Sequence, residues 1–114
     1  VLAVHYGVDF RGDSGDTVSA AAAGKVVFAG SRAGYGNLIE LRHDNGISTR
    51  YAHLSRIGVK VGDKVAKHSA IGRIGSTGRS TGPHLHYEIL VFGKPVDPRR
   101  FWRVGENVLK TQDH

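Results

Sequence analysis

The stretch NLIELRHDNGISTRYAHL, residues 37–54, is the clearest indication of fold in the sequence. Two runs rich in β-branched and aromatic residues flank Asp44-Asn45-Gly46, and asparagine followed by glycine suits the positive φ angles of a tight hairpin turn. A further short strand is expected at GKVVFAG, residues 24–30, which is bounded by glycines. The sequence therefore predicts antiparallel strands joined by short turns.

The composition agrees with one small β domain. The chain has 114 residues, of which 39% are hydrophobic, and this is enough for one core. Sixteen glycines against three prolines favour many tight turns between short strands. The best helix candidate, TVSAAAAG at residues 17–24, is too short to be stable alone, and a strand or a loop is equally compatible with it. We expect an all-β fold of mostly antiparallel sheets.

The net charge of the chain and its lack of cysteine exclude several classes of function. The formal net charge of +6 favours anionic partners such as nucleic acid, acidic lipid or an anionic wall polymer. The basic residues are spread from Arg11 to Lys110 without a groove-reading motif, so we expect no nucleic-acid partner. No apolar run approaches the ~20 residues of a membrane span, and the absence of cysteine excludes disulfides and thiolate metal sites.

The stretch GPHLHYEIL, residues 82–90, places two histidines on alternate positions of a predicted strand. Alternate residues of a strand share a face, so we expect an ionisable face made of His84, His86 and Glu88, and an apolar face turned to the core. Alternate Cα atoms lie ~6.5–7 Å apart, which lets both imidazoles reach one small volume. The pair could hold zinc on a sheet, but a surface strand with two titratable side chains is also consistent with this motif alone.

A further histidine and a carboxylate occur in HYGVD, residues 5–9. In an extended strand the Cα atoms of His5 and Asp9 would be ~13 Å apart, which is too far to share one ion through bonds of ~2.1 Å. The chain must bend between them if they do share an ion, and Gly7 permits a bend or a bulge. A polar pair at a strand end, with Asp9 capping a turn, is the alternative.

A third segment, RYAHLS at residues 50–55, adds another histidine. Alternation from Ile47 through Thr49 and Tyr51 predicts that His53 lies on the same face as these three residues, at the end of the strand. Taken alone, a histidine at the end of a strand is also consistent with a purely structural role. Combined with the previous motifs, however, it completes a set that can supply three zinc ligands, an open position, and two histidines for proton transfer and charge stabilisation.

The glycine-rich loop GSTGRSTGP, residues 75–83, leads into the histidine strand. It lacks the GxxxxGK phosphate-binding pattern and precedes a strand instead of a helix, so a phosphate site is not supported. We expect this loop to form a rim where an extended substrate approaches the backbone closely.

Taken together, these motifs resemble the lysostaphin/LytM-type zinc metallopeptidases of bacterial cell walls. The resemblance covers about residues 4 to 102 and rests on HYGVD (5–9), GYGN (34–37), YAHLS (51–55), VKVGDKV (59–65) and GSTGRSTGPHLHYE (75–88). It implies an antiparallel β domain of short strands that form an open groove, with the metal at the floor. We assign residues 1–104 to this domain and residues 105–114 to a C-terminal tail.

The resemblance also implies the site residues and the cofactor. Its metal ligands correspond to His5, Asp9 and His86, which would hold one Zn²⁺ per domain, and its two catalytic histidines to His53 and His84. All five positions are occupied, unlike in family members that lost ligands and now activate amidases. The chain departs from the pattern at one residue outside this set. His68 stands where the family often has glycine in a turn, and we attach no metal to it.

The implied activity is hydrolysis of peptide bonds in the cross-links or stems of peptidoglycan, in the bacterial cell envelope. Zinc bound to imidazole and carboxylate ligands acidifies water and polarises a peptide carbonyl. We hypothesise that one of His53 and His84 accepts the proton of the water. The other would donate a hydrogen bond to the tetrahedral oxyanion.

Four further residues are expected to support the site. Tyr35, Asn37 and Thr81 would line the substrate groove, and Glu88 would orient a metal ligand by a hydrogen bond or make a plain structural one. The partners are then peptidoglycan peptides, with other cell-wall or division proteins as further partners. The alternative is a module that docks on the wall or on an amidase without cutting anything.

Overall fold

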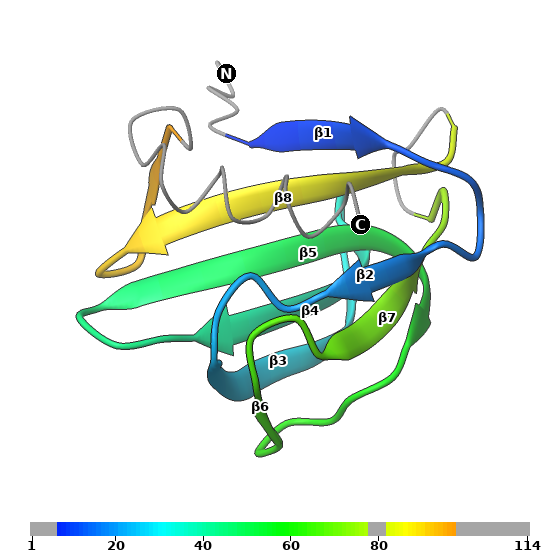
Figure 1. Cartoon of the computed structure of the whole chain (residues 1–114). Helices are drawn as coiled ribbons and strands as arrows, with labels where there is room; N and C mark the ends of the chain where they lie inside the picture. Colours follow the sequence, from blue (N-terminus) through cyan, green and yellow to red (C-terminus); the bar gives the residue numbers. More distant parts are fainter. Residues whose placement is uncertain (1–6, 78–81, 98–114) are drawn as a thin grey trace.

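The computed structural model of the chain describes residues 7–77 and 82–97. These residues form nine strands and no helix, so the predicted all-β class is confirmed (Figure 1). Accordingly, this part of the chain has no helix long and apolar enough to cross a membrane. The strands are β1 (Val8–Arg11), β2 (Thr17–Ser19), β3 (Gly24–Arg32), β4 (Gly36–Arg42), β5 (Ile47–Ile57), β6 (Lys64–Val65), β7 (Ala70–Ile74), β8 (His84–Val91) and β9 (Lys94–Val96).

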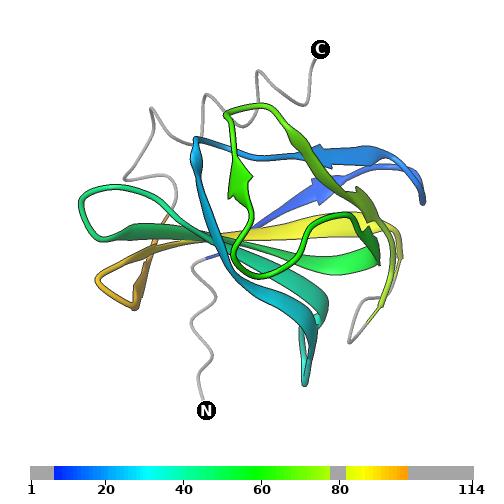
Figure 2. The ribbon, with the colours of Figure 1, turned by 90° about the horizontal axis from the view of Figure 1, so that it is seen from below.

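All the strand pairs are antiparallel, and the main sheet has the order β1-β8-β5-β4-β3-β6. Strands β1 and β8 are far apart in the sequence but lie side by side (Figure 1). Strand β7 pairs with both β5 and β2, and β9 pairs with β8. As a result, the β2–β7 pair folds over one face of the main sheet (Figure 2).

The predicted hairpin at residues 37–54 is confirmed. Strands β4 and β5 pair across a short turn, with Leu41 opposite Thr49. Asn45 and Gly46 in that turn have φ angles of 61° and 74°, the left-handed conformation that asparagine and glycine adopt most readily. The segment TVSAAAAG begins as strand β2 and does not form a helix.

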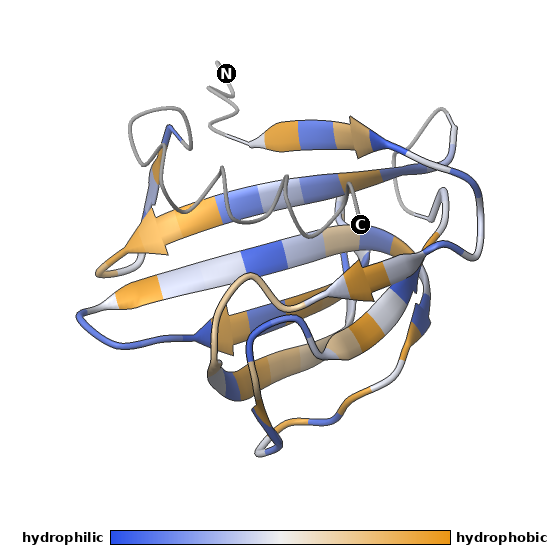
Figure 3. Cartoon of the chain, viewed as in Figure 1, coloured by the Kyte–Doolittle hydropathy of each residue, from blue (hydrophilic) through white to orange (hydrophobic). Residues whose placement is uncertain are grey.

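The core lies between the main sheet and the β2–β7 pair. Leu85, Tyr87 and Ile89 of β8 have no solvent exposure there, as the alternation predicted. They pack in one cluster with residues of β2, β3, β4, β5 and β7, including Tyr51, whose ring centroid lies 5.5 Å from that of Tyr87. Hydrophobic and hydrophilic residues alternate along β1 and along the first part of β8, whereas the end of β8 is hydrophobic throughout (Figure 3). The polar residues of these two strands are therefore directed to the opposite face of the sheet.

Candidate active site

Three strands bring together the predicted site residues that the structure describes. Asp9 of β1 lies opposite His86 of β8, and His86 in turn lies opposite Ala52 of β5. The ring centroid of His53 is 5.1 Å from that of His84 and 5.9 Å from that of His86. The fifth predicted residue, His5, lies outside the described residues.

The side chains of Asp9 on β1 and His86 on β8 are in direct contact. Asp9 Oδ1 lies 2.8 Å from His86 Nδ1 and 3.6 Å from His84 Nε2. Gly7 is essential to this approach, because a Cβ atom at that position would overlap the His86 imidazole. The bend that the sequence assigned to Gly7 stays a prediction, since it concerns the path from His5.

The predicted face of His53 is wrong. Thr49 and Tyr51 point into the core, where their hydroxyl oxygens lie 2.8 Å apart, whereas His53 lies on the opposite face beside His84 and His86. Strict alternation would have directed His53 into the core.

A β-bulge explains the difference. Ile39 of β4 pairs with Tyr51, but the next pair is Asn37 with Leu54, so Ala52 and His53 lie together opposite Leu38. His53 has a φ of 62°, and its backbone N–H donates to the Tyr35 carbonyl at 2.8 Å. One extra residue reverses the alternation of a strand, and a non-glycine residue held in a left-handed conformation within a strand is a form of backbone strain that clusters at functional sites.

Both candidate catalytic histidines are anchored through Nδ1. His53 Nδ1 donates to the Thr77 carbonyl at 2.6 Å, and His84 Nδ1 donates to the Gly82 carbonyl at 2.8 Å. These bonds place the lone pair of each neutral ring on Nε2. Burial lowers the pKa of His53, reinforced by its two histidine neighbours and opposed by the Thr77 hydrogen bond. The neutral ring is therefore favoured at His53.

Glu88 lies behind His86 and is almost buried, with 7% of its surface exposed. Its Oε2 accepts a hydrogen bond from His86 Nε2 at 2.9 Å, and the Tyr35 hydroxyl donates to Oε1 at 3.2 Å. Burial raises the pKa of Glu88, but the hydrogen bond and charge of His86, the charge of Arg50 and the Tyr35 bond outweigh it, so the net pKa is lowered. The carboxylate is thus held ionised behind the imidazole.

The donor groups at this position have the chemistry that zinc prefers. In residues 7–77 and 82–97, no group of three or more histidine, aspartate or glutamate side chains is arranged to hold a metal ion. However, the imidazole of His86 and the carboxylate of Asp9 are in contact, and both are common zinc ligands. His86 also donates its other ring N–H to a carboxylate, as metal-ligating histidines usually do. The described part of the site fits zinc.

Comparison with known proteins then places the chain in a family. The model of the family described as Peptidase family M23 matches residues 3–98. The chain belongs to this family. It is 46% identical over 96 residues to "Peptidoglycan DD-endopeptidase ShyA" of Vibrio cholerae, covering 84% of this chain and 22% of that protein. The chain therefore spans only about a fifth of the length of such curated relatives.

Solved structures of other M23 peptidases have the same fold. The catalytic domain of lysostaphin from Staphylococcus simulans superposes with a TM-score of 0.82 at 44% identity, covering 87% of this chain and 79% of that chain. A zinc containing peptidase from Vibrio cholerae gives a TM-score of 0.78 at 42% identity, covering 82% of this chain and 29% of that chain.

Within the M23 domain, the residues expected to line the groove have different surroundings. The Tyr35 ring lies 6.4 Å from the His86 ring, so Tyr35 is part of the histidine cluster. The Asn37 side-chain amide donates to the Leu54 carbonyl at 2.9 Å, and its backbone N–H donates to Thr77 Oγ1. Asn37 thereby holds Thr77, the hydrogen-bond partner of His53, in place. Thr81 lies outside the described residues, and the open groove stays a prediction.

Sequence reasoning missed two charged residues next to this cluster. Arg50 Nε donates to Glu40 Oε1 at 2.7 Å, and Arg50 NH1 lies 3.6 Å from Glu88 Oε1. Neither residue belongs to a motif that the resemblance used, and their proximity to Glu88 follows only from the strand register. Correct pairing of β4 with β5 and of β5 with β8 would have revealed both.

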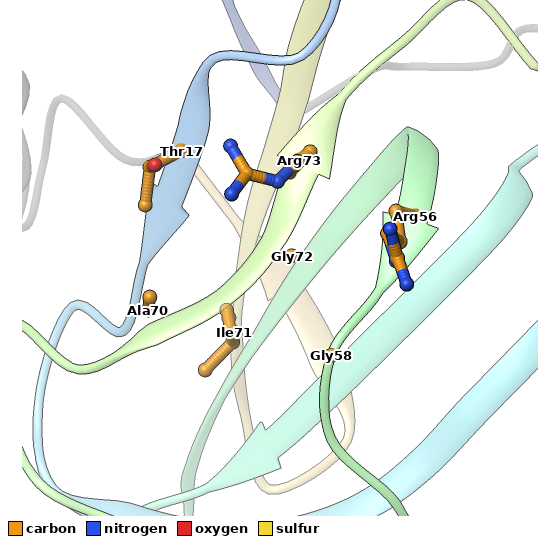
Figure 4. Close-up of a pocket in the computed structure, with 7 residues that line it drawn as sticks. All are labelled: Thr17, Arg56, Gly58, Ala70, Ile71, Gly72 and Arg73. Atoms are coloured by element: carbon orange, nitrogen blue, oxygen red, sulfur yellow. The ribbon is translucent and has the colours of Figure 1, made fainter.

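A separate hollow of about 250 Å³ lies by β7, away from these residues. Arg73 and Arg56 stand on its two sides (Figure 4). Its lining consists of Thr17, Arg56, Gly58, Ala70, Ile71, Gly72 and Arg73. Arg73 NH1 donates to the Gly15 carbonyl at 2.9 Å, which ties β7 to the loop before β2. None of the predicted site residues lines this hollow.

Proposed function

We propose that this M23 domain is a zinc-dependent endopeptidase that hydrolyses peptide bonds in the cross-links or stems of peptidoglycan. The observation that carries the proposal is the convergence of Asp9, His53, His84 and His86 on one face of the sheet. The bulge at His53 supports it further, because the strand alternation is broken at the one residue that would otherwise be directed away from the cluster.

We assign Asp9 and His86 as two ligands of one zinc ion, with His5 as the third. The carboxylate of Asp9 and the imidazole of His86 are in contact, and the hydrogen bond from His86 Nε2 to Glu88 orients the ring so that Nδ1 is directed at Asp9. When bound, zinc would supply a Lewis acid that acidifies water and polarises a peptide carbonyl.

His53 and His84 would handle the proton and the developing negative charge. Each ring is held by an Nδ1 hydrogen bond to a backbone carbonyl, so each acts through Nε2. One Nε2 accepts the proton of the attacking water, and the protonated Nε2 of the other donates to the oxyanion. Holding both rings to the backbone keeps these atoms in place before substrate binds.

The substrate class follows from the relatives and agrees with the charge of the chain. The name of the ShyA relative specifies peptidoglycan, and the net charge of +6 favours a polymer that carries carboxylates and phosphates. Action on peptidoglycan places the domain in the bacterial cell envelope, whether periplasmic, at the cell surface or secreted.

Digestion of defined muropeptides tests this function. The zinc-loaded chain should release new free amines, identified by mass spectrometry, and a chelator should stop the release until zinc is restored. Peptidoglycan binding without any new amine would contradict the endopeptidase and support the non-cleaving module instead.

A further inference from the structure

We infer that Arg50, held by Glu40, is a positioning residue that fixes the orientation of His86 through Glu88. This inference rests on the proposed function, in which His86 binds zinc. It extends the site from the histidine cluster to a row of three charged residues, Glu40, Arg50 and Glu88, that crosses three strands.

The row is created by the strand register. Glu40 of β4 is the direct partner of Arg50 of β5, and Arg50 is the direct partner of Glu88 of β8. All three side chains lie on the face that carries the histidines. They are largely withdrawn from solvent, with exposed fractions of 20% for Arg50, 19% for Glu40 and 10% for Glu88.

Arg50 and His86 lie at different oxygens of Glu88. Oε1 faces Arg50 NH1 at 3.6 Å, whereas Oε2 accepts from His86 Nε2 at 2.9 Å. The Tyr35 hydroxyl lies between the two oxygens, 3.2 and 3.3 Å from them, and its own oxygen accepts from Arg50 NH1 at 3.3 Å. Arg50 therefore contacts Glu88 both directly and through Tyr35, on the side away from the imidazole.

This arrangement fixes the orientation of the His86 ring. A carboxylate accepts hydrogen bonds, so Nε2 donates to Glu88 Oε2, and Nδ1 on the other side of the ring lies 2.8 Å from Asp9 Oδ1. A carboxylate this buried needs a cationic partner to hold its orientation, and Arg50 lies 3.6 Å from Glu88 Oε1.

A purely structural ion pair would behave differently. A cross-strand pair of opposite charges contributes only about 0.2–1 kcal/mol to stability, so its loss should leave the zinc site unchanged. If Arg50 positions His86, its replacement should instead weaken zinc binding while the domain stays folded. Replacement of a hydrogen-bond partner behind a metal ligand typically weakens metal binding about 10–100-fold.

The test compares Arg50→Met with Arg42→Met in the full chain. Arg42 lies on β4, two residues from Glu40, and is an exposed residue without a hydrogen bond or ion pair among the side chains described. Zinc affinity is measured by competition with a chromophoric chelator. The ring ¹⁵N shifts of His86, which report the hydrogen bonds of its two nitrogens, are measured in the zinc-free protein.

We expect Arg50→Met to bind zinc about 10–100-fold more weakly and to shift the His86 Nε2 resonance, because the hydrogen bond to Glu88 is disturbed, whereas Arg42→Met should match the parent chain. Arg50→Lys keeps the positive charge but lacks the planar guanidinium, so its zinc affinity should lie between those of Arg50→Met and the parent chain. Parent-like zinc affinity and ring shifts in Arg50→Met would overturn the inference.

The two measurements separate this inference from the proposed function. Absence of zinc binding by the parent chain would contradict the proposed function, and the ring shifts of the zinc-free protein would still decide the role of Arg50. Should Arg50→Met fail to fold, Glu40→Gln provides the same readouts, with a smaller change of the same sign expected because it removes only the charge that holds Arg50.

Discussion

The two faces of the β5–β8 pair carry hydrogen-bond chains of different character. On the core face, His43 Nε2 lies 2.7 Å from Thr49 Oγ1, which lies 2.8 Å from the Tyr51 hydroxyl, and that hydroxyl accepts the Ala21 N–H. On the other face, Arg50, Glu88 and His86 form an ionic chain that ends at Asp9, whose side chain is 61% exposed.

This difference separates stability from ligand binding. Thr49 and Tyr51 on the core face are buried hydroxyl groups that satisfy one another, so they should contribute to folding alone. The ionic chain instead holds buried charges in a row that ends at the exposed carboxylate of Asp9. Such buried charges add little to stability, so we expect them to serve the binding of a ligand at that end. Because the two chains use alternate residues of the same strands, substitutions on one face should leave the other face unaffected.

The largest expected effect is on the ionic face. His86→Ala should remove stoichiometric zinc and lower the cleavage rate about 1,000-fold or more, since metal polarisation contributes several kcal/mol. His53→Ala should keep the zinc but lower the rate about 100- to 10,000-fold, because it removes a proton-transfer group. Zinc content by atomic absorption and muropeptide cleavage by mass spectrometry measure both effects.

His68→Gly is the matched control for these two substitutions. His68 lies in a turn with a φ of 72°, a conformation that glycine adopts without strain, and it is not part of the histidine cluster. This variant should keep both zinc and cleavage. Cleavage retained by either site variant, or zinc lost from His53→Ala, would contradict the assigned roles.

The sequence predicted β8 fully but β5 only in part, and the reason is physical. The pairing of β8 with β1 and with β5 has no register shift, so period-two reasoning correctly separated Leu85 and Tyr87 from the histidines. In β5 the bulge inserts one residue before Leu54 and moves His53 to the other face. A bulge depends on how two strands pair, and no local pattern in RYAHLS signals it.

The charged row shows the same limit. Glu40 and Arg50 are ten residues apart on two arms of a hairpin, and their contact requires the register set by the turn at residues 43–46. Motif spacing identifies groups that resemble known ligands, but it does not identify groups that act through them. The domain boundaries of 1–104 and 105–114 also stay predictions, because the described residues end at 97.

A smaller effect is expected on the core face. Tyr51→Phe removes the acceptor of the buried Ala21 N–H and one partner of Thr49, which should lower the free energy of unfolding by about 1–3 kcal/mol. Zinc affinity should not change. Urea unfolding and chelator competition on the same samples measure both quantities, and a parallel loss of zinc affinity would show that the two faces are coupled.

The smallest effect on the free energy of unfolding is expected from a substitution at Tyr87, which provides a comparison for Tyr51 within the core. Tyr87 pairs directly with Tyr51 and is equally buried, but its hydroxyl has no hydrogen-bond partner in the described part of the chain. Burial, with a lesser contribution from Tyr51, raises the pKa of Tyr87, so this hydroxyl stays neutral. Tyr87→Phe should therefore leave the free energy of unfolding unchanged or raise it by about 1 kcal/mol, because it removes an unsatisfied polar atom.

Since both substitutions delete the same atom from neighbouring rings, the difference between their unfolding free energies reports the hydrogen bonds of Tyr51 and little else. Equal losses in the two variants would mean that the hydroxyl of Tyr87 also has a hydrogen-bond partner. In that case the hydrogen-bond chain of the core face would not end at Tyr51.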